Sequence, residues 1–173
     1  ADIVDDYDVF LIDQCGVLLS GDGAYPWAPN ALLALGRADR RIILLSNSGK
    51  RAAPNEARLT NLGFVRDCFQ MVLSSGEAAY ADLAGRLGHD LPPRPRVWLH
   101  ARDNDTSMIE GLPVMLVEDA EQADLVLIAG SQAEHLSLDW YRAALHAAAR
   151  KGVPALCTNP DMSMLTPDGQ KFG

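Results

Sequence analysis

Two short apolar segments, each ending in a polar side chain, constrain the fold of this chain more than any other feature. Residues 7–13 (YDVFLID) end at Asp13, and residues 41–46 (RIILLS) end at Ser46. Short runs of this kind are typical of strands buried in a parallel sheet. Ligands of open α/β sheets bind beyond the carboxyl ends of the strands, so Asp13 and Ser46 are expected at one small site. For either residue alone, a turn or a cap is the alternative.

The first half of the chain alternates between strand and helix signals. Helices are expected over residues 31–37, 54–62 and 77–87, and a third strand over residues 71–73. Pro29 suits the start of the first helix, and Gly63 suits the end of the second. Ser74 and Glu77 have the spacing of a capping box. Right-handed crossovers between these strands predict a parallel sheet with helices on both faces.

A proline-rich stretch at residues 91–95 (LPPRP) interrupts this alternation and predicts a module boundary. Beyond it, strands are expected over residues 96–100, 114–117, 125–129 and 155–158. A helix is expected from about Ser137 to Lys151, because apolar residues recur along one face. The second module is therefore also predicted to be α/β.

Composition excludes several classes of function. The 173 residues carry a net charge of −8, and no basic run occurs that would bind nucleic acid independently of sequence. No apolar run approaches the roughly 20 residues of a membrane span. The three cysteines, Cys15, Cys68 and Cys157, lack the paired spacing of a zinc site. Reduced thiols in a cytoplasmic protein are therefore expected. A dinucleotide-binding loop is disfavoured, because Gly21 and Gly23 are followed by Pro26 where a third glycine is needed.

Several motifs in order resemble those of the haloacid dehalogenase (HAD) superfamily, and most closely its class IIA phosphatases. The segments at residues 13–17 (DQCGV) and 44–48 (LLSNS) are similar to its first two motifs, and further matches follow at residues 25–26, 73–78, 123–127, 157–161 and 169–173. The resemblance implies a Rossmann-like HAD core, represented by its first half only, with an inserted α/β cap domain. It implies a core at residues 1–92, a cap at 93–160 and the start of a return to the core at 161–173.

The resemblance also implies roles for individual residues. Asp13 takes the position of the catalytic nucleophile that forms an aspartyl-phosphate. Ser46 takes the position that hydrogen-bonds the phosphoryl oxygens, with Asn47 and Ser48 continuing the phosphate-binding loop. The implied cofactor is Mg²⁺, held by the Asp13 carboxylate and the backbone carbonyl of Cys15. The implied substrate is a small phosphorylated metabolite.

Two departures from the family pattern leave two interpretations open. The general acid and base position of family phosphatases, two residues after the nucleophile, holds Cys15 instead of aspartate. A thiol is a weak hydrogen-bond donor and is shorter by one atom. The third and fourth motifs, a lysine and acidic metal ligands, have no counterpart up to residue 173, so the sequence resembles a segment of a longer protein. The chain is interpreted either as an HAD-like hydrolase or as a family member that binds a phosphorylated metabolite without turnover.

Other polar residues carry weaker expectations. Lys50 and Arg51 follow the second motif, where they face either phosphate or solvent. Asn159 and Asp161 match the segment that leaves the cap, with a simple turn as the alternative. No nucleic acid or membrane partner is expected, and a homo-oligomer is left open.

Overall fold

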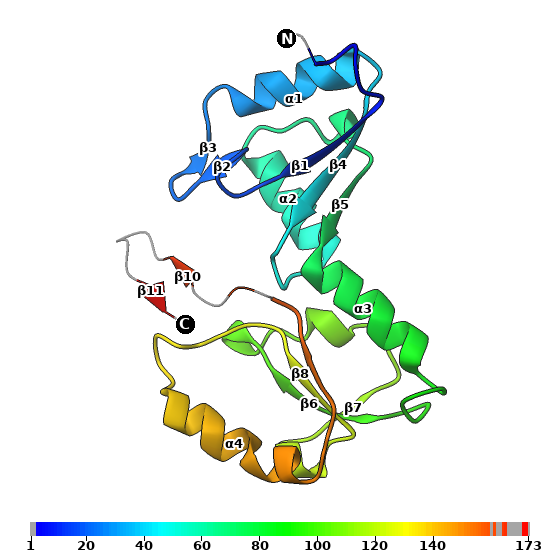
Figure 1. The fold of residues 1–173 in the computed structure, drawn as a ribbon, viewed down its shortest axis with the longest axis vertical. Helices are drawn as coiled ribbons and strands as arrows, with labels where there is room; N and C mark the ends of the chain where they lie inside the picture. The colour runs from blue at the N-terminus through cyan, green and yellow to red at the C-terminus, as the bar shows by residue number, and fades with distance from the viewer. Residues whose placement is uncertain (1–2, 160, 162–163, 166–170, 173) are drawn as a thin grey trace.

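The computed structural model describes residues 3–159, 161, 164–165 and 171–172. Figure 1 shows the two larger, parallel sheets, one in each half of the molecule along its long axis, with a helix leading from the first to the second. The first sheet contains β1 (Val9–Asp13), β4 (Arg41–Ser46) and β5 (Met71–Ser74) in the order β1-β4-β5, and both pairings are parallel. The expected site residues Asp13 and Ser46 therefore end neighbouring parallel strands.

One face of the first sheet is packed against two helices, α1 (Ala28–Arg37) and α2 (Ala52–Asn61). Leu32 of α1 and Leu59 of α2 join Ile42 and Leu44 of β4 in a single buried cluster. The expectation of helices on both faces is wrong for this sheet. The strands follow one another in chain order across the sheet, so both right-handed crossovers step in the same direction and place their helices on the same side.

The opposite face of the first sheet is apolar and exposed. Val9 and Leu11 of β1 are 41% and 63% exposed, and Met71 and Leu73 of β5 are each 41% exposed. The expectation that residues 7–13 form a buried strand is therefore wrong. Only alternate side chains of β1, such as Phe10, pack against the core.

The second sheet has helices on both faces. It contains β6 (Arg96–His100), β7 (Met115–Leu116), β8 (Leu125–Ile128) and β9 (Ala155–Cys157) in the parallel order β7-β6-β8-β9. On one face, α3 (Ser75–Arg86) buries Leu83 in a cluster with Leu127. On the other, α4 (Leu138–Arg150) buries Ala148 in a cluster with Val126. The implied domain boundary at residues 92 and 93 stays a prediction, and α3 packs with the second sheet.

The remaining elements are short. The glycine-rich loop after β1 contains a small hairpin that the sequence analysis did not anticipate, β2 (Leu19–Ser20) with β3 (Gly23–Ala24). Single 3₁₀ turns occur at Arg66–Cys68, Arg102–Asn104, Ser107–Ile109 and Ala120–Gln122. A second pair, β10 (Met164–Leu165) with β11 (Lys171–Phe172), lies in the segment where a return to the core is implied, and most of that segment lies outside the described residues. Among the residues that are described, no helix is long and apolar enough to cross a membrane.

Candidate active site

Asp13, Ser46 and Asn47 line one open cavity of about 440 Å³ at the carboxyl ends of β1 and β4. Asp13 lies opposite Leu45 in the parallel register, so Ser46 is one residue beyond it on the neighbouring strand. The other lining residues are Leu45, Leu73, Ser74, Ser75 and Ala78. The structure therefore brings together three of the residues that the sequence analysis assigned to one site.

The hydrogen bonds of Asp13 and Ser46 leave reactive atoms available. Oδ1 of Asp13 accepts the N–H of Gln14 at 2.7 Å, which fixes the carboxylate at the strand end. Oγ of Ser46 accepts the N–H of Ser48 at 3.1 Å. Because this hydroxyl acts as an acceptor within the loop, its own proton is free to be donated to a ligand oxygen.

Asn47 and Ser48 have different surroundings. The side-chain amide of Asn47 donates a hydrogen bond to the carboxylate of Asp161, 114 residues away in the chain. Ser48 does not line the cavity, and its hydroxyl accepts the N–H of Lys50 at 3.2 Å. Asn47 is therefore placed to connect the loop after β4 with the segment after β9, while Ser48 orders the loop itself.

Cys15 does not line this cavity, and its side chain is exposed. The chain reverses immediately after it, because Gly16 has a φ of +80° and donates its N–H to the carbonyl of Leu19 at 2.7 Å. The preceding residue, Gln14, is only 2% exposed, and its Nε2 has no hydrogen-bond partner in the described part of the chain.

The N-terminus of α3 forms a wall of the cavity that the sequence analysis did not place there. Ser74 caps the helix as predicted, because its Oγ accepts the N–H of Glu77 at 3.0 Å. The same hydroxyl donates to the carbonyl of Lys50 at 2.7 Å. The capping-box spacing was the available sequence signal. The position of the helix beside Ser46 depends on the pairing of β4 with β5.

Arg51 and Lys50 do not line the Asp13 cavity. Arg51 donates to both carboxylate oxygens of Glu77, at 2.7 and 2.9 Å, and its guanidinium carbon lies 3.3 Å from the centre of the Tyr80 ring. These hydrogen bonds from Arg51, assisted by one from the N–H of Ala52, hold the pKa of Glu77 below its ordinary value. Lys50 lines a separate cavity of about 270 Å³ together with Asp103 and Asp105, among others.

The donor set at the site is small but chemically suited to a hard cation. The described residues contain no group of three or more histidine, cysteine, aspartate or glutamate side chains that could hold a metal ion. The Asp13 carboxylate and the Cys15 carbonyl would supply two oxygen ligands. Mg²⁺ binds in this way in many proteins, through one or two carboxylates while keeping several waters, so the residues present fit part of its shell.

Comparisons with known proteins identify the family and the fold of the chain. The family model of the haloacid dehalogenase-like hydrolases matches residues 10–113. A hydrolase of the haloacid dehalogenase-like family from Brucella suis has a similar structure, with a TM-score of 0.80, 26% sequence identity, and coverage of 99% of this chain and 62% of that one. A 4-nitrophenylphosphatase from Thermotoga maritima shares the fold with a TM-score of 0.70, 23% identity, and coverage of 98% and 61%.

A putative nagD protein also shares the fold, with a TM-score of 0.72, 23% identity, and coverage of 95% of this chain and 61% of that one. No curated protein matches the sequence. The chain thus spans about three fifths of the length of these solved structures.

Proposed function

The chain belongs to the haloacid dehalogenase-like hydrolases, and we propose that it carries the nucleophile and phosphate-binding loop of a phosphatase. The proposed substrate is a small phosphorylated metabolite, a phosphate monoester. The observation that carries this proposal is the convergence of Asp13 and Ser46 on one cavity from adjacent parallel strands. The phosphatase relative from Thermotoga maritima supports the reaction class.

In the proposed reaction, a carboxylate oxygen of Asp13 attacks phosphorus, and the bond from phosphorus to the leaving oxygen breaks. The leaving oxygen takes a proton from solvent. Water then attacks the aspartyl-phosphate, which releases inorganic phosphate, returns a proton to solvent and regenerates the carboxylate. The hydroxyl of Ser46 donates a hydrogen bond to a phosphoryl oxygen, which orients the group for attack.

We further propose Mg²⁺ as the cofactor, held by the Asp13 carboxylate and the Cys15 carbonyl. When bound, the ion offsets the negative charge shared by the nucleophile and the phosphate. The cytoplasm is the proposed location. The proposed partner is the phosphorylated substrate, and a second copy of the chain is a further candidate.

The test is the hydrolysis of p-nitrophenyl phosphate in the presence of Mg²⁺. Asp13→Asn is expected to reduce the rate to background, because an amide is not a nucleophile of this kind. Asp22→Asn is the matched control, since Asp22 is exposed in the β2–β3 turn and does not line the cavity. Equal loss in both variants, or full activity in Asp13→Asn, would contradict the proposal.

Binding of a phosphorylated metabolite without turnover is the second candidate, and Cys15 at the acid and base position favours it. This function predicts that inorganic phosphate shifts the Ser46 amide resonance while no phosphate ester is hydrolysed. Turnover that depends on Asp13 would exclude it.

A further inference from the structure

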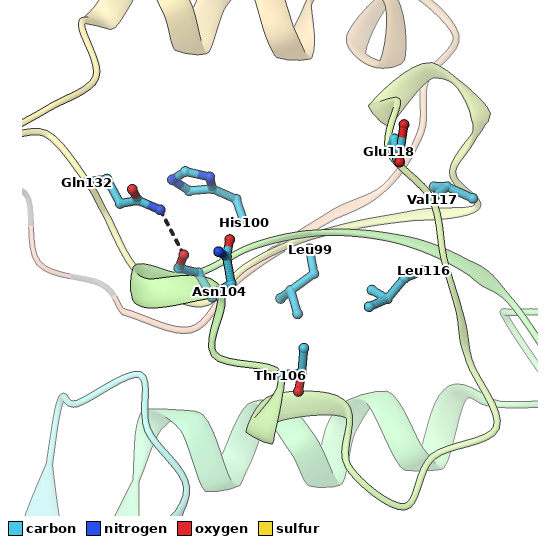
Figure 2. A pocket seen from close by; sticks show the side chains of 9 residues that line it. Leu99, His100, Asn104, Thr106, Leu116, Val117, Glu118 and Gln132 are labelled. Atoms are coloured by element: carbon cyan, nitrogen blue, oxygen red, sulfur yellow. Dashed lines mark hydrogen bonds between the residues drawn. The ribbon is translucent and has the colours of Figure 1, made fainter.

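The chain segments that follow β6 and β7 diverge where β7 ends, and the gap between them is called the fork below. Strand β7 pairs with β6 only through Arg96 with Met115 and Val97 with Leu116. The last hydrogen bond of the pair runs from the N–H of Val117 to the carbonyl of Val97, at 3.0 Å. Beyond it the two chain segments diverge and enclose a cavity of about 400 Å³. Figure 2 shows this cavity, which is lined by Leu99, His100, Ala101, Asn104, Thr106, Leu116, Val117, Glu118 and Gln132.

The backbone of Leu99 points into this fork. Along β6, Arg96 and His100 direct their carbonyls to β8, where they accept the N–H groups of Asp124 and Ala129. Because backbone groups alternate between the two edges of a strand, Val97 and Leu99 face the β7 side. Val97 is paired there, but β7 ends before it reaches Leu99. An open strand edge of this kind offers an N–H and a carbonyl to the amide groups of a ligand.

The walls of the fork combine apolar and ordered polar groups. Leu99 and Leu116 supply apolar contact, while the side chain of Val117 packs with the cluster around Trp98. Opposite them, Nε2 of Gln132 donates to the carbonyl of Ala101 at 2.9 Å (Figure 2). The N–H of Gln132 donates to the hydroxyl of Tyr141, 2.9 Å away. Gln132 is thus held in place before any ligand arrives, which reduces the entropy lost on binding.

The charge of the lining disfavours anions. Glu118 is the acidic residue of the lining, and neither lysine nor arginine is among the nine lining residues. His100 is only 6% exposed, its Nε2 lies 2.9 Å from the hydroxyl of Tyr141, and burial lowers its pKa. The fork shares no lining residue with the Asp13 cavity. Its chemistry therefore differs from that of a phosphate site.

We propose that this fork is a second binding site, for a small uncharged amide that carries an apolar side group. The amide pairs with the N–H and carbonyl of Leu99, and the apolar group packs against the side chains of Leu99 and Leu116. The site is independent of the proposed phosphatase function, because the two cavities have separate linings.

The experiment compares two probes that differ only in their terminal group, an uncharged carboxamide in N-acetyl-leucinamide and a carboxylate in N-acetyl-leucine. Each is titrated into the ¹⁵N-labelled 173-residue protein while the amide resonances of Leu99 and Gln132 are followed. We expect saturable shifts of both resonances with the neutral amide, with a dissociation constant on the order of 1 mM. The carboxylate should bind at least about tenfold more weakly, because Glu118 repels it.

Three variants locate the site. Leu116→Trp fills the fork and should weaken binding of N-acetyl-leucinamide at least about tenfold, since the cavity volume is lost. Met115→Trp is the matched control, because Met115 is the neighbouring residue of β7, is 42% exposed and does not line the cavity. If Leu116→Trp does not fold, Thr106→Phe blocks the same cavity from an exposed position.

Three results would overturn the proposal. The first is equal affinity for both probes, which indicates non-specific apolar contact. The second is the absence of any saturable shift at Leu99 up to the solubility of N-acetyl-leucinamide. The third is unchanged binding in a folded variant that fills the fork, which would show that the ligand binds elsewhere.

Discussion

Ser46 and Ser74 lie directly opposite each other in the parallel register of β4 and β5. Ser46 begins the loop of the candidate phosphate site, and Ser74 caps α3, the helix that leads to the second sheet. The N–H of Gly76 donates to the carbonyl of Ser48 at 3.0 Å, and the Ser74 hydroxyl donates to that of Lys50. The loop and the helix are therefore one packed unit, and changes at the start of α3 should be transmitted to Ser46.

Gly76→Ala tests this packing. A Cβ at Gly76 would lie 2.5 Å from the carbonyl oxygen of Lys50 and would also overlap that of Gly49. We expect a loss of about 1–3 kcal/mol in the free energy of unfolding, because backbone atoms must move apart. Gly85→Ala is the control in the same helix, where a Cβ meets nothing within 4 Å. It should gain about 0.5–1 kcal/mol from helix propensity. Urea unfolding measures both, and equal stability of the two variants would exclude the tight contact.

Glu77 should make stability depend on acid pH. Hydrogen bonds from Arg51 lower the pKa of Glu77 in the folded protein relative to 4.5, so the unfolded chain binds the proton more strongly. The stabilisation is present above pH 4.5 and is lost as the pH falls from there through the lower folded pKa. Glu77→Gln should therefore be less stable than wild type at pH 7, and the difference should shrink towards pH 3. Urea unfolding across this range measures it.

Asp82→Asn is the control for this experiment. It removes an exposed ion pair between Asp82 and Arg86, at 3.5 Å, in the same helix. Such a pair contributes little, roughly 0.3–0.5 kcal/mol. If the difference in unfolding free energy between wild type and Glu77→Gln stays constant with pH, Glu77 acts through packing and not through its charge.

The sequence predicted the strands well where local pattern decides them. The segments at 41–46 and 96–100 match β4 and β6 because each is central, paired on both sides, and rich in β-branched or aliphatic residues. The start of α2 was placed two residues late, at Pro54 and not at Ala52. The N–H of Ala52, in the first turn of α2, finds its hydrogen-bond acceptor in the carboxylate of Glu77 at 2.9 Å. No local signal shows a cap that comes from a residue 25 positions away.

The sequence predicted only the part of the candidate site that follows from neighbouring strands. Asp13 and Ser46 could be paired in advance, because carboxyl ends of adjacent parallel strands meet at one edge. The contact of Asn47 with Asp161 joins residues 114 positions apart, and it depends on how the chain returns from β9. The apolar pattern of β1 also did not show which of its two faces packs against the core. An apolar strand sequence indicates that both faces are suited to burial and does not show which neighbours are present.

Metal affinity follows from the donor set at Asp13. With one carboxylate and one backbone carbonyl, the 173-residue chain should bind Mg²⁺ with a dissociation constant on the order of 1 mM or weaker. Asp13→Asn should remove that residual affinity, and Asp22→Asn should retain it. Calorimetric titration measures both. A micromolar affinity in wild type would show that further carboxylates, such as Asp161, complete the shell.

The substitution of Cys15 for the expected acid should make the rate depend on the leaving group. A positioned general acid contributes a factor of about 10²–10⁴ when the leaving oxygen needs a proton. Aryl phosphates such as p-nitrophenyl phosphate leave without that help, while alkyl phosphates do not. Cys15→Asp should therefore raise kcat for an alkyl phosphate by up to this factor and change kcat for the aryl phosphate by less than about tenfold.

Cys15→Ser is the control that separates acid catalysis from a change in size, because a hydroxyl is close in volume to the thiol and is not acidic enough to protonate the leaving oxygen efficiently. It should leave the ratio of alkyl to aryl rates near the wild-type value. The measurement is that ratio for wild type and both variants in the presence of Mg²⁺, with Asp13→Asn as the inactive reference. A wild type that already hydrolyses alkyl phosphates rapidly, with no change in Cys15→Asp, would mean that another group protonates the leaving oxygen and that position 15 has no part in proton transfer.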